Sequence, residues 1–128
     1  MPVIPDLPWT ADRPVEGPGV VLHTELRLRR LRDVPPFMAT SVAILRQVSR
    51  SPGARSALLR AHPLARSFAT VSWWDDEASM RAFARTDPHR AAMRRWAPRL
   101  SSFGNRPLPA TGRMPTVDEA VAATATGP

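Results

Sequence analysis

The chain contains no cysteine, no tyrosine and no lysine, and each absence excludes a kind of chemistry. Without cysteine there is no disulfide, no thiolate nucleophile and no thiolate metal ligand. Without tyrosine or lysine there is no phenol and no amine for acid–base work. The side chains that remain able to exchange protons near neutral pH are three histidines, His23, His62 and His89.

Long apolar segments are also missing. No stretch approaches the roughly 18 apolar residues that a membrane span needs, and the proline-rich N-terminus lacks the basic segment and apolar core of a secretory signal. The 128 residues are enough for one domain with a modest core. We therefore expect a cytoplasmic protein of a single domain with no membrane partner.

All 18 basic residues are arginine, and the net charge of +7 raises the question of a nucleic-acid partner. The arginines are spread along the chain, and no recognised nucleic-acid motif accompanies them. Their use in place of lysine is typical of a GC-rich genome. We therefore expect no nucleic-acid partner.

The chain divides into three parts: a proline-rich arm over residues 1–18, with Trp9 as its anchor; a domain over residues 19–110; and a tail over residues 111–128. Alternating apolar residues predict strands over 20–28, 54–61 and 66–74, and an edge strand over 103–108. Apolar residues at helical spacing predict a helix after Pro35 and Pro36 that stops at Ser51. The tail is expected to form a short helix over 116–123.

The segment from Ser67 to Trp96 carries the strongest signals. Its strand presents four residues on one face, namely Phe68, Thr70, Ser72 and Trp74. Asp75 to Glu77 supply a helix start, and the helix runs to Arg85. Asp87 and Pro88 restart it, so that one apolar face is shared by His89, Ala92, Met93 and Trp96.

The order β-α-β-β-α-β predicts an α+β, ferredoxin-like fold with an antiparallel four-stranded sheet and helices on one face. The other face of such a sheet has to be covered. Pairing of two sheets across a two-fold axis is a common solution, so we expect a homodimer.

Three elements carry a family resemblance: the strand Thr70–Trp74, the acidic turn followed by Ala78–Phe83, and the segment Asp87–Met93. In this order they resemble the dimeric α+β barrel superfamily, and within it the antibiotic-biosynthesis-monooxygenase-like group. Residues 26–37 and 51–54 are similar to its spheroidene-monooxygenase-like branch of actinobacterial proteins. The resemblance covers roughly residues 19–109.

The resemblance implies a small-molecule tailoring enzyme of secondary metabolism, a monooxygenase with a hydrophobic aromatic or polyene substrate. It leaves open a haem-dependent enzyme with His89 as axial ligand, a non-redox cyclase, isomerase or dehydratase, and a non-catalytic dimeric ligand-binding module. A fold shared by such different activities does not decide the reaction. The cofactor is therefore expected to be none or haem.

His89 is the candidate catalytic residue, as general base or as haem ligand; the alternative is a histidine that bonds only locally. The candidate substrate-binding residues are Phe37, Phe68, Thr70, Ser72, Trp74, Phe83, Met93, Trp96 and Arg66. Each has an alternative without a ligand. The aromatic residues would form the core or a dimer interface, the hydroxyls of Thr70 and Ser72 would bond to the backbone, and Arg66 would be an exposed surface charge. The scattered histidines predict no zinc site.

Overall fold

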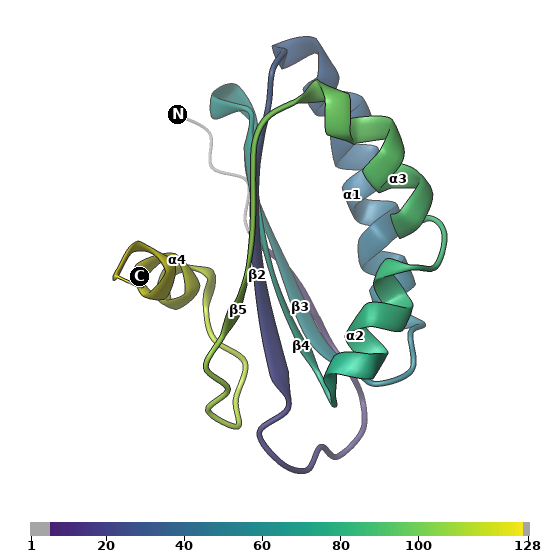
Figure 1. Ribbon diagram of the computed structural model, residues 1–128, viewed down its shortest axis with the longest axis vertical. Helices are drawn as coiled ribbons and strands as arrows, with labels where there is room; N and C mark the ends of the chain where they lie inside the picture. Colours follow the sequence, from purple (N-terminus) through teal and green to yellow (C-terminus); the bar gives the residue numbers. More distant parts are fainter. Residues whose placement is uncertain (1–5, 127–128) are drawn as a thin grey trace.

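The computed structural model describes residues 6–126 and shows an α+β, ferredoxin-like fold, in which a layer of helices packs on an antiparallel sheet (Figure 1). Within these residues the sheet has five strands in the order β1-β3-β4-β2-β5. The strands are β1 (Leu7–Thr10), β2 (Val20–Leu28), β3 (Ala54–His62), β4 (Ser67–Trp74) and β5 (Leu100–Leu108). The helices are α1 (Val34–Ser49), α2 (Glu77–Ala84), α3 (His89–Trp96) and α4 (Val117–Thr126). None of these helices is long and apolar enough to cross a bilayer.

The predicted β-α-β-β-α-β order is confirmed for β2 through β5. β2 has the predicted bounds, and the predicted break between α2 and α3 is present. Asp76 caps α2 by accepting a hydrogen bond from the backbone nitrogen of Ser79 at 2.7 Å. β5 starts at Leu100, three residues before its predicted start at Phe103.

The prediction of a four-stranded sheet was wrong, because the N-terminal arm adds β1. This strand pairs antiparallel with β3, and Trp9 lies opposite Ala57. Trp9 packs against the cluster that contains Ala57 and Trp74, which confirms it as the anchor of the arm. Pro8 lacks a backbone donor, a defect that an edge strand tolerates. The strand has only four residues and one of them is proline, so its alternation was not visible in the sequence.

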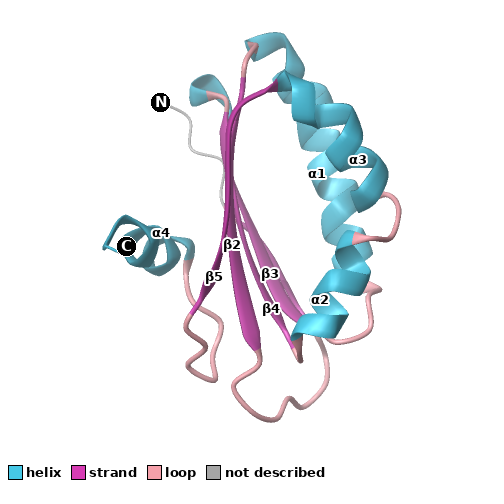
Figure 2. Cartoon of the chain, viewed as in Figure 1, coloured by secondary structure: helices cyan, strands magenta, loops and turns pink. Residues whose placement is uncertain are grey.

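The expectation that the helices lie on one face holds for α1, α2 and α3 but fails for α4. Figure 2 shows α4 on the opposite side of the sheet. There Val117 and Ala120 pack against Val21, Val71 and Trp73, and all five side chains are buried. Since α4 covers part of the second face, that face is less open than the homodimer argument assumed.

Arg60, on the second face of β3, joins the N-terminal arm and α4 to the sheet. Its Nε lies 2.8 Å from Oδ1 of Asp6, and its Nη1 lies 2.6 Å from Oδ1 of Asp118 in α4. The hydrogen bond from Arg60 holds the pKa of Asp6 below its ordinary value. These contacts explain how a short helix keeps a fixed place on the sheet.

Gly19 lies where the arm enters β2, in a left-handed conformation with φ of +68°. A Cβ there would lie 2.4 Å from the backbone oxygen of Trp74 and 2.7 Å from Nη1 of Arg55. Gly17 is also left-handed, with φ of +76°, but its Cβ would meet nothing within 4 Å. The two glycines thus separate the cost of the backbone conformation from the cost of the close approach.

We expect Gly17→Ala to lower the free energy of unfolding by about 1 kcal/mol, because only the left-handed backbone is penalised. Gly19→Ala adds a collision with a backbone oxygen and should cost at least about 3 kcal/mol. Urea unfolding of both variants measures the difference. Equal losses in the two variants would contradict the packing described for Gly19.

Candidate functional site

A cavity of about 540 Å³ lies between the sheet and the helices α1, α2 and α3. The four residues of β4 that face these helices explain its position. They are large at both ends, Phe68 and Trp74, and small and polar between, Thr70 and Ser72. The sheet and the helices therefore pack closely at two ends and leave space in the middle.

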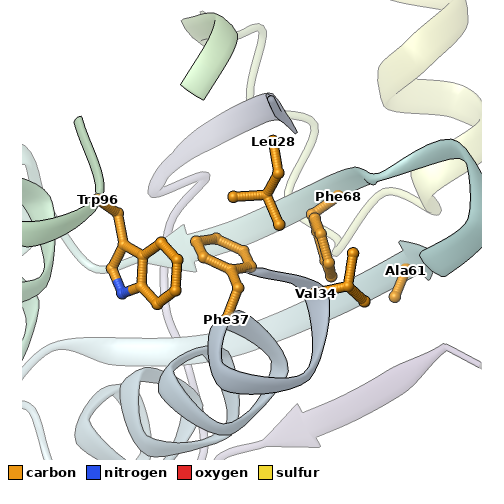
Figure 3. Close-up of a cluster of buried hydrophobic side chains, with 6 residues drawn as sticks. All are labelled: Leu28, Val34, Phe37, Ala61, Phe68 and Trp96. Carbon is orange, nitrogen blue, oxygen red and sulfur yellow. The ribbon is translucent and has the colours of Figure 1, made fainter. Parts of the chain in front are cut away.

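The first end is an aromatic cluster around Phe37 of α1 (Figure 3). The Phe37 ring lies 4.6 Å from the Phe68 ring and 5.1 Å from the Trp96 ring between centroids. All three side chains are buried. Edge contacts of this kind add to the free energy gained from apolar burial, so this end is firmly closed.

The second end is built around Trp74, which is fully buried. Trp74 packs with Val48 and Ala54 and lies 5.1 Å from the Phe83 ring of α2. The indole nitrogens of Trp74 and Trp96 are both buried and have no hydrogen-bonding partner among residues 6–126. An unpartnered buried donor carries a free-energy cost, and both tryptophans line the cavity.

The floor of the cavity carries a polar row that crosses three strands. Thr24 of β2 lies opposite Asn105 of β5 on one side and opposite Thr70 of β4 on the other. All three line the cavity, where Thr24 is half-buried and Thr70 and Asn105 are exposed to solvent. Thr24 and Asn105 escaped the sequence analysis, because strand register, which places them beside Thr70, is not visible in one strand's alternation.

The mouth of the cavity lies between α3 and β5. Met93 and Phe103 line the cavity and are nevertheless 41% and 46% exposed. Ser101 and Ser102 of β5 line it as well. An apolar rim beside an edge strand suits the entry of a hydrophobic molecule.

His89 begins α3 and lines the cavity wall, half-buried. Its Nδ1 lies 3.0 Å from the backbone oxygen of Ala84, and its ring lies 4.8 Å from the Phe83 ring. A carbonyl oxygen only accepts hydrogen bonds, so Nδ1 carries the proton and Nε2 keeps a lone pair. Burial lowers the pKa of His89 below its ordinary value, while the bond to Ala84 opposes this. The imidazole is therefore neutral at pH 7 and able to accept a proton.

Ala84 has an oxygen available for His89 because of Pro88. In a continuous helix the oxygen of residue 84 would accept from the nitrogen of residue 88, but proline has no N–H. Asp87 accepts a hydrogen bond from the backbone nitrogen of Ala91 at 3.1 Å, which stabilises the restart. The sequence Asp87-Pro88-His89 therefore both breaks the helix and orients the imidazole.

The cavity brings together His89 and eight of the nine predicted substrate-binding residues: Phe37, Phe68, Thr70, Ser72, Trp74, Phe83, Met93 and Trp96. Arg66 is the exception. It follows the turn after β3 with φ of 59° and does not line the cavity, so the structure does not bring it together with the other eight. Thr70 and Ser72, the two residues with hydroxyl groups, lie on the cavity side of β4.

The other two histidines lie elsewhere. His23 is 1% exposed on the second face of the sheet, where its Nε2 lies 3.3 Å from Oε1 of Glu25. Burial lowers the pKa of His23, and the nearby Glu25 opposes this. His62 ends β3 and is exposed.

Haem fits this cavity poorly. His89 would offer Nε2 to iron, but the lining contains no charged side chain to neutralise the two propionates that haem carries. Among residues 6–126 no three His, Asp or Glu side chains converge as a metal site. The lining suits a neutral, largely apolar organic molecule.

No protein-family model and no curated protein sequence matches the chain. Solved structures do match its fold. One is a putative monooxygenase from Fusobacterium nucleatum, with a TM-score of 0.71 and 8% identity over 80% of this chain and 48% of that one. The chain thus spans about half the length of that protein.

Two further structures have a comparable similarity. SnoaB, a cofactor-independent oxygenase from Streptomyces nogalater, has a TM-score of 0.59 and 18% identity over 78% of this chain and all of that one. A ferredoxin-fold protein related to antibiotic biosynthesis monooxygenases, from Listeria monocytogenes, has a TM-score of 0.58 and 18% identity over 85% of this chain and 64% of that one. The chain therefore has the ferredoxin-like fold of the antibiotic-biosynthesis-monooxygenase-like proteins.

The lowered pKa values of His23 and His89 predict how stability depends on pH. The unfolded chain, with histidine pKa values near about 6.5, binds protons more readily than the folded one as pH falls below that value. The contribution of these two histidines to the free energy of unfolding should therefore be fully present above about pH 6.5. It should decrease as the pH falls from there towards the pKa values of the folded protein.

His89→Asn should make that decrease smaller, because asparagine can still donate to Ala84 but does not titrate. Urea unfolding at several pH values between 7.5 and 5 measures the change. If the free energy of unfolding decreases equally in the variant and in the natural chain, His89 has the same pKa in the folded and the unfolded chain, which would contradict the prediction.

Proposed function

We propose that the protein is a cytoplasmic tailoring enzyme of secondary metabolism, a cofactor-free monooxygenase acting on a hydrophobic aromatic or polyene substrate. The observation that carries the proposal is the position of His89 in the lining of an apolar cavity, with Nδ1 3.0 Å from the backbone oxygen of Ala84, an arrangement that leaves Nε2 to accept a proton. The shared fold with SnoaB, a cofactor-independent oxygenase, supports the absence of a cofactor.

The proposed reaction converts a CH₂ group activated by neighbouring rings into a carbonyl. Nε2 of His89 takes a proton from this carbon, and the delocalised carbanion transfers its electrons to dioxygen. One oxygen atom stays on the carbon as the carbonyl and the other leaves as water, which takes up both hydrogens. The substrate supplies all four electrons, so the reaction needs no external reductant.

The cavity favours each part of this reaction. A bound substrate displaces water from the apolar walls, which strengthens the interactions of a developing anion with the floor. Burial keeps His89 unprotonated before the substrate binds. The hydroxyls of Thr24 and Thr70 and the amide of Asn105 donate hydrogen bonds to oxygen atoms on the ring edge.

We expect His89→Asn to lower kcat for oxygen uptake by about 100- to 10,000-fold, the usual contribution of a general base. An oxygen electrode with a flat CH₂-containing polycyclic ketone as substrate measures this. His62→Asn is the matched control, because His62 is exposed and lies outside the cavity.

Three results would contradict the proposal. Product formation at an unchanged rate without oxygen would favour the cyclase, isomerase or dehydratase alternative. A Soret band in the purified protein that disappears in His89→Asn would favour haem. If neither His89→Asn nor changes of the cavity tryptophans altered any activity, the non-catalytic ligand-binding module would be favoured.

The polar floor should select substrates that carry oxygen. Thr24→Val, Thr70→Val and Asn105→Leu each remove hydrogen bonds at nearly constant volume, and each should weaken binding of 1,8-dihydroxyanthraquinone about 2- to 10-fold. Binding of anthracene, which has no oxygen, should stay the same. Quenching of tryptophan fluorescence measures both probes.

Thr40→Val is the control for the floor variants. Thr40 also lines the cavity, but its hydroxyl already donates to the backbone oxygen of Pro36 at 3.1 Å. It should leave the binding of both probes unchanged. Equal weakening of anthracene and the quinone by the floor variants would contradict a role in recognising oxygen.

A homodimer is also part of the proposal. Its support is the family resemblance, together with the part of the second sheet face that α4 leaves open, where Glu25 and Arg27 are exposed. Sedimentation equilibrium measures the mass directly. A monomer at all concentrations would contradict this part without affecting the proposed reaction.

A further inference from the structure

Gln47, in the last turn of α1, is the side chain that connects His89 to a helix outside its own segment. Its Nε2 donates to the backbone oxygens of Phe83 at 3.1 Å and Thr86 at 3.0 Å. Its Oε1 accepts from the backbone nitrogen of His89 at 2.8 Å. The two oxygens can only accept and the N–H of His89 can only donate, so only one orientation of the amide makes all three bonds.

The three backbone groups belong to the junction between two helices. The oxygens of Phe83 and Thr86 also accept backbone hydrogen bonds, from Thr86 and Arg90 at 3.1 Å each. The N–H of His89 lies in the first turn of α3 and therefore has no partner within its own helix. Gln47 binds groups on both sides of the junction, although it lies 42 residues before His89 in the chain. No local pattern identifies it, because the groups that it binds lie in a segment far away in the sequence.

From this geometry we infer that Gln47 is a positioning residue for His89, an inference that rests on the proposed role of His89 as base. Gln47 fixes the backbone at His89, while Ala84 and Phe83 fix its ring through the 3.0 Å hydrogen bond and the 4.8 Å ring contact. Both of these partners belong to the end of α2, which Gln47 holds through Phe83. The amide thus maintains the distance between Nδ1 of His89 and the oxygen of Ala84.

That distance determines where the imidazole carries its proton. When Nδ1 donates to Ala84, Nε2 is unprotonated and can accept a proton from substrate. When the junction loosens, the proton distributes between the two nitrogens. A ring protonated at Nε2 has no lone pair there, so the active fraction of the protein decreases.

The test compares Gln47→Met with Arg46→Met by ¹⁵N NMR of the histidine rings. Methionine has nearly the length of glutamine but neither donates nor accepts a strong hydrogen bond, and Arg46 is an exposed neighbour on the same helix. In the natural chain and in Arg46→Met, His89 should be protonated at Nδ1 only. In Gln47→Met its two nitrogens should show a mixture of the two tautomers.

Kinetics add a second readout. Gln47→Met should lower kcat for oxygen uptake by up to about 100-fold with little change in KM, because the cavity that binds substrate is intact. Gln47→Glu should not restore activity, since a carboxylate accepts from His89 but cannot donate to Phe83 and Thr86. Gln47→Asn, an amide too short to reach both sides, provides the same comparison if Gln47→Met does not fold.

Two results would overturn the inference: a natural chain with His89 protonated at Nε2, or a folded Gln47→Met protein with the natural tautomer. The NMR measurement uses no substrate. It therefore stays informative if His89→Asn leaves oxygen uptake unchanged, a result that would contradict the proposed function alone.

Discussion

The placement of the N-terminal arm and of α2 depends on the hydrogen bonds and the ion pair of one buried guanidinium group, that of Arg55. It is 3% exposed, its Nε lies 2.7 Å from Oδ1 of Asp75, and its other nitrogens donate to the backbone oxygens of Glu16 and Gly17. It also lies 4.9 Å from the Trp73 ring. A buried charge is tolerated only when it is paired and its donors are satisfied, so the arm must follow the path that supplies these oxygens. Because Asp75 directly precedes the cap of α2, the same ion pair fixes where the second helix begins.

The cavity follows from the sizes of the side chains that separate the two layers. The cluster around Phe37 and the cluster around Trp74 keep the sheet and helices apart, and between them lie Thr24, Thr70 and Ser72, which are too short to fill the gap. Larger apolar residues at these positions would stabilise the protein by filling space. Positions where a protein gives up this stability are frequently functional, and here the unfilled positions are also the polar ones.

Sequence patterns predicted the parts of the site that depend on a single element. Alternation placed Phe68, Thr70, Ser72 and Trp74 on one face of a strand, and helical spacing placed His89 on the face of Trp96. The patterns could not place Asn105 beside Thr24, because that depends on the register between β2 and β5. They predicted the helix over 116–123, which is α4, but not its place on the second face. They also missed the hydrogen bonds of Gln47, since these and the place of α4 depend on contacts between distant segments.

The orientation of His89, by contrast, is contained in a short stretch of sequence. Pro88 leaves the oxygen of Ala84 without the N–H that a helix would supply, and the next residue provides a replacement donor in Nδ1 of His89. A residue with a backbone N–H at position 88 would offer that oxygen a competing donor. The proline thus leaves the oxygen to Nδ1 of His89, the arrangement in which Nε2 is unprotonated. Gln47 keeps the broken ends together, so that an interruption of the backbone becomes a fixed position for a base.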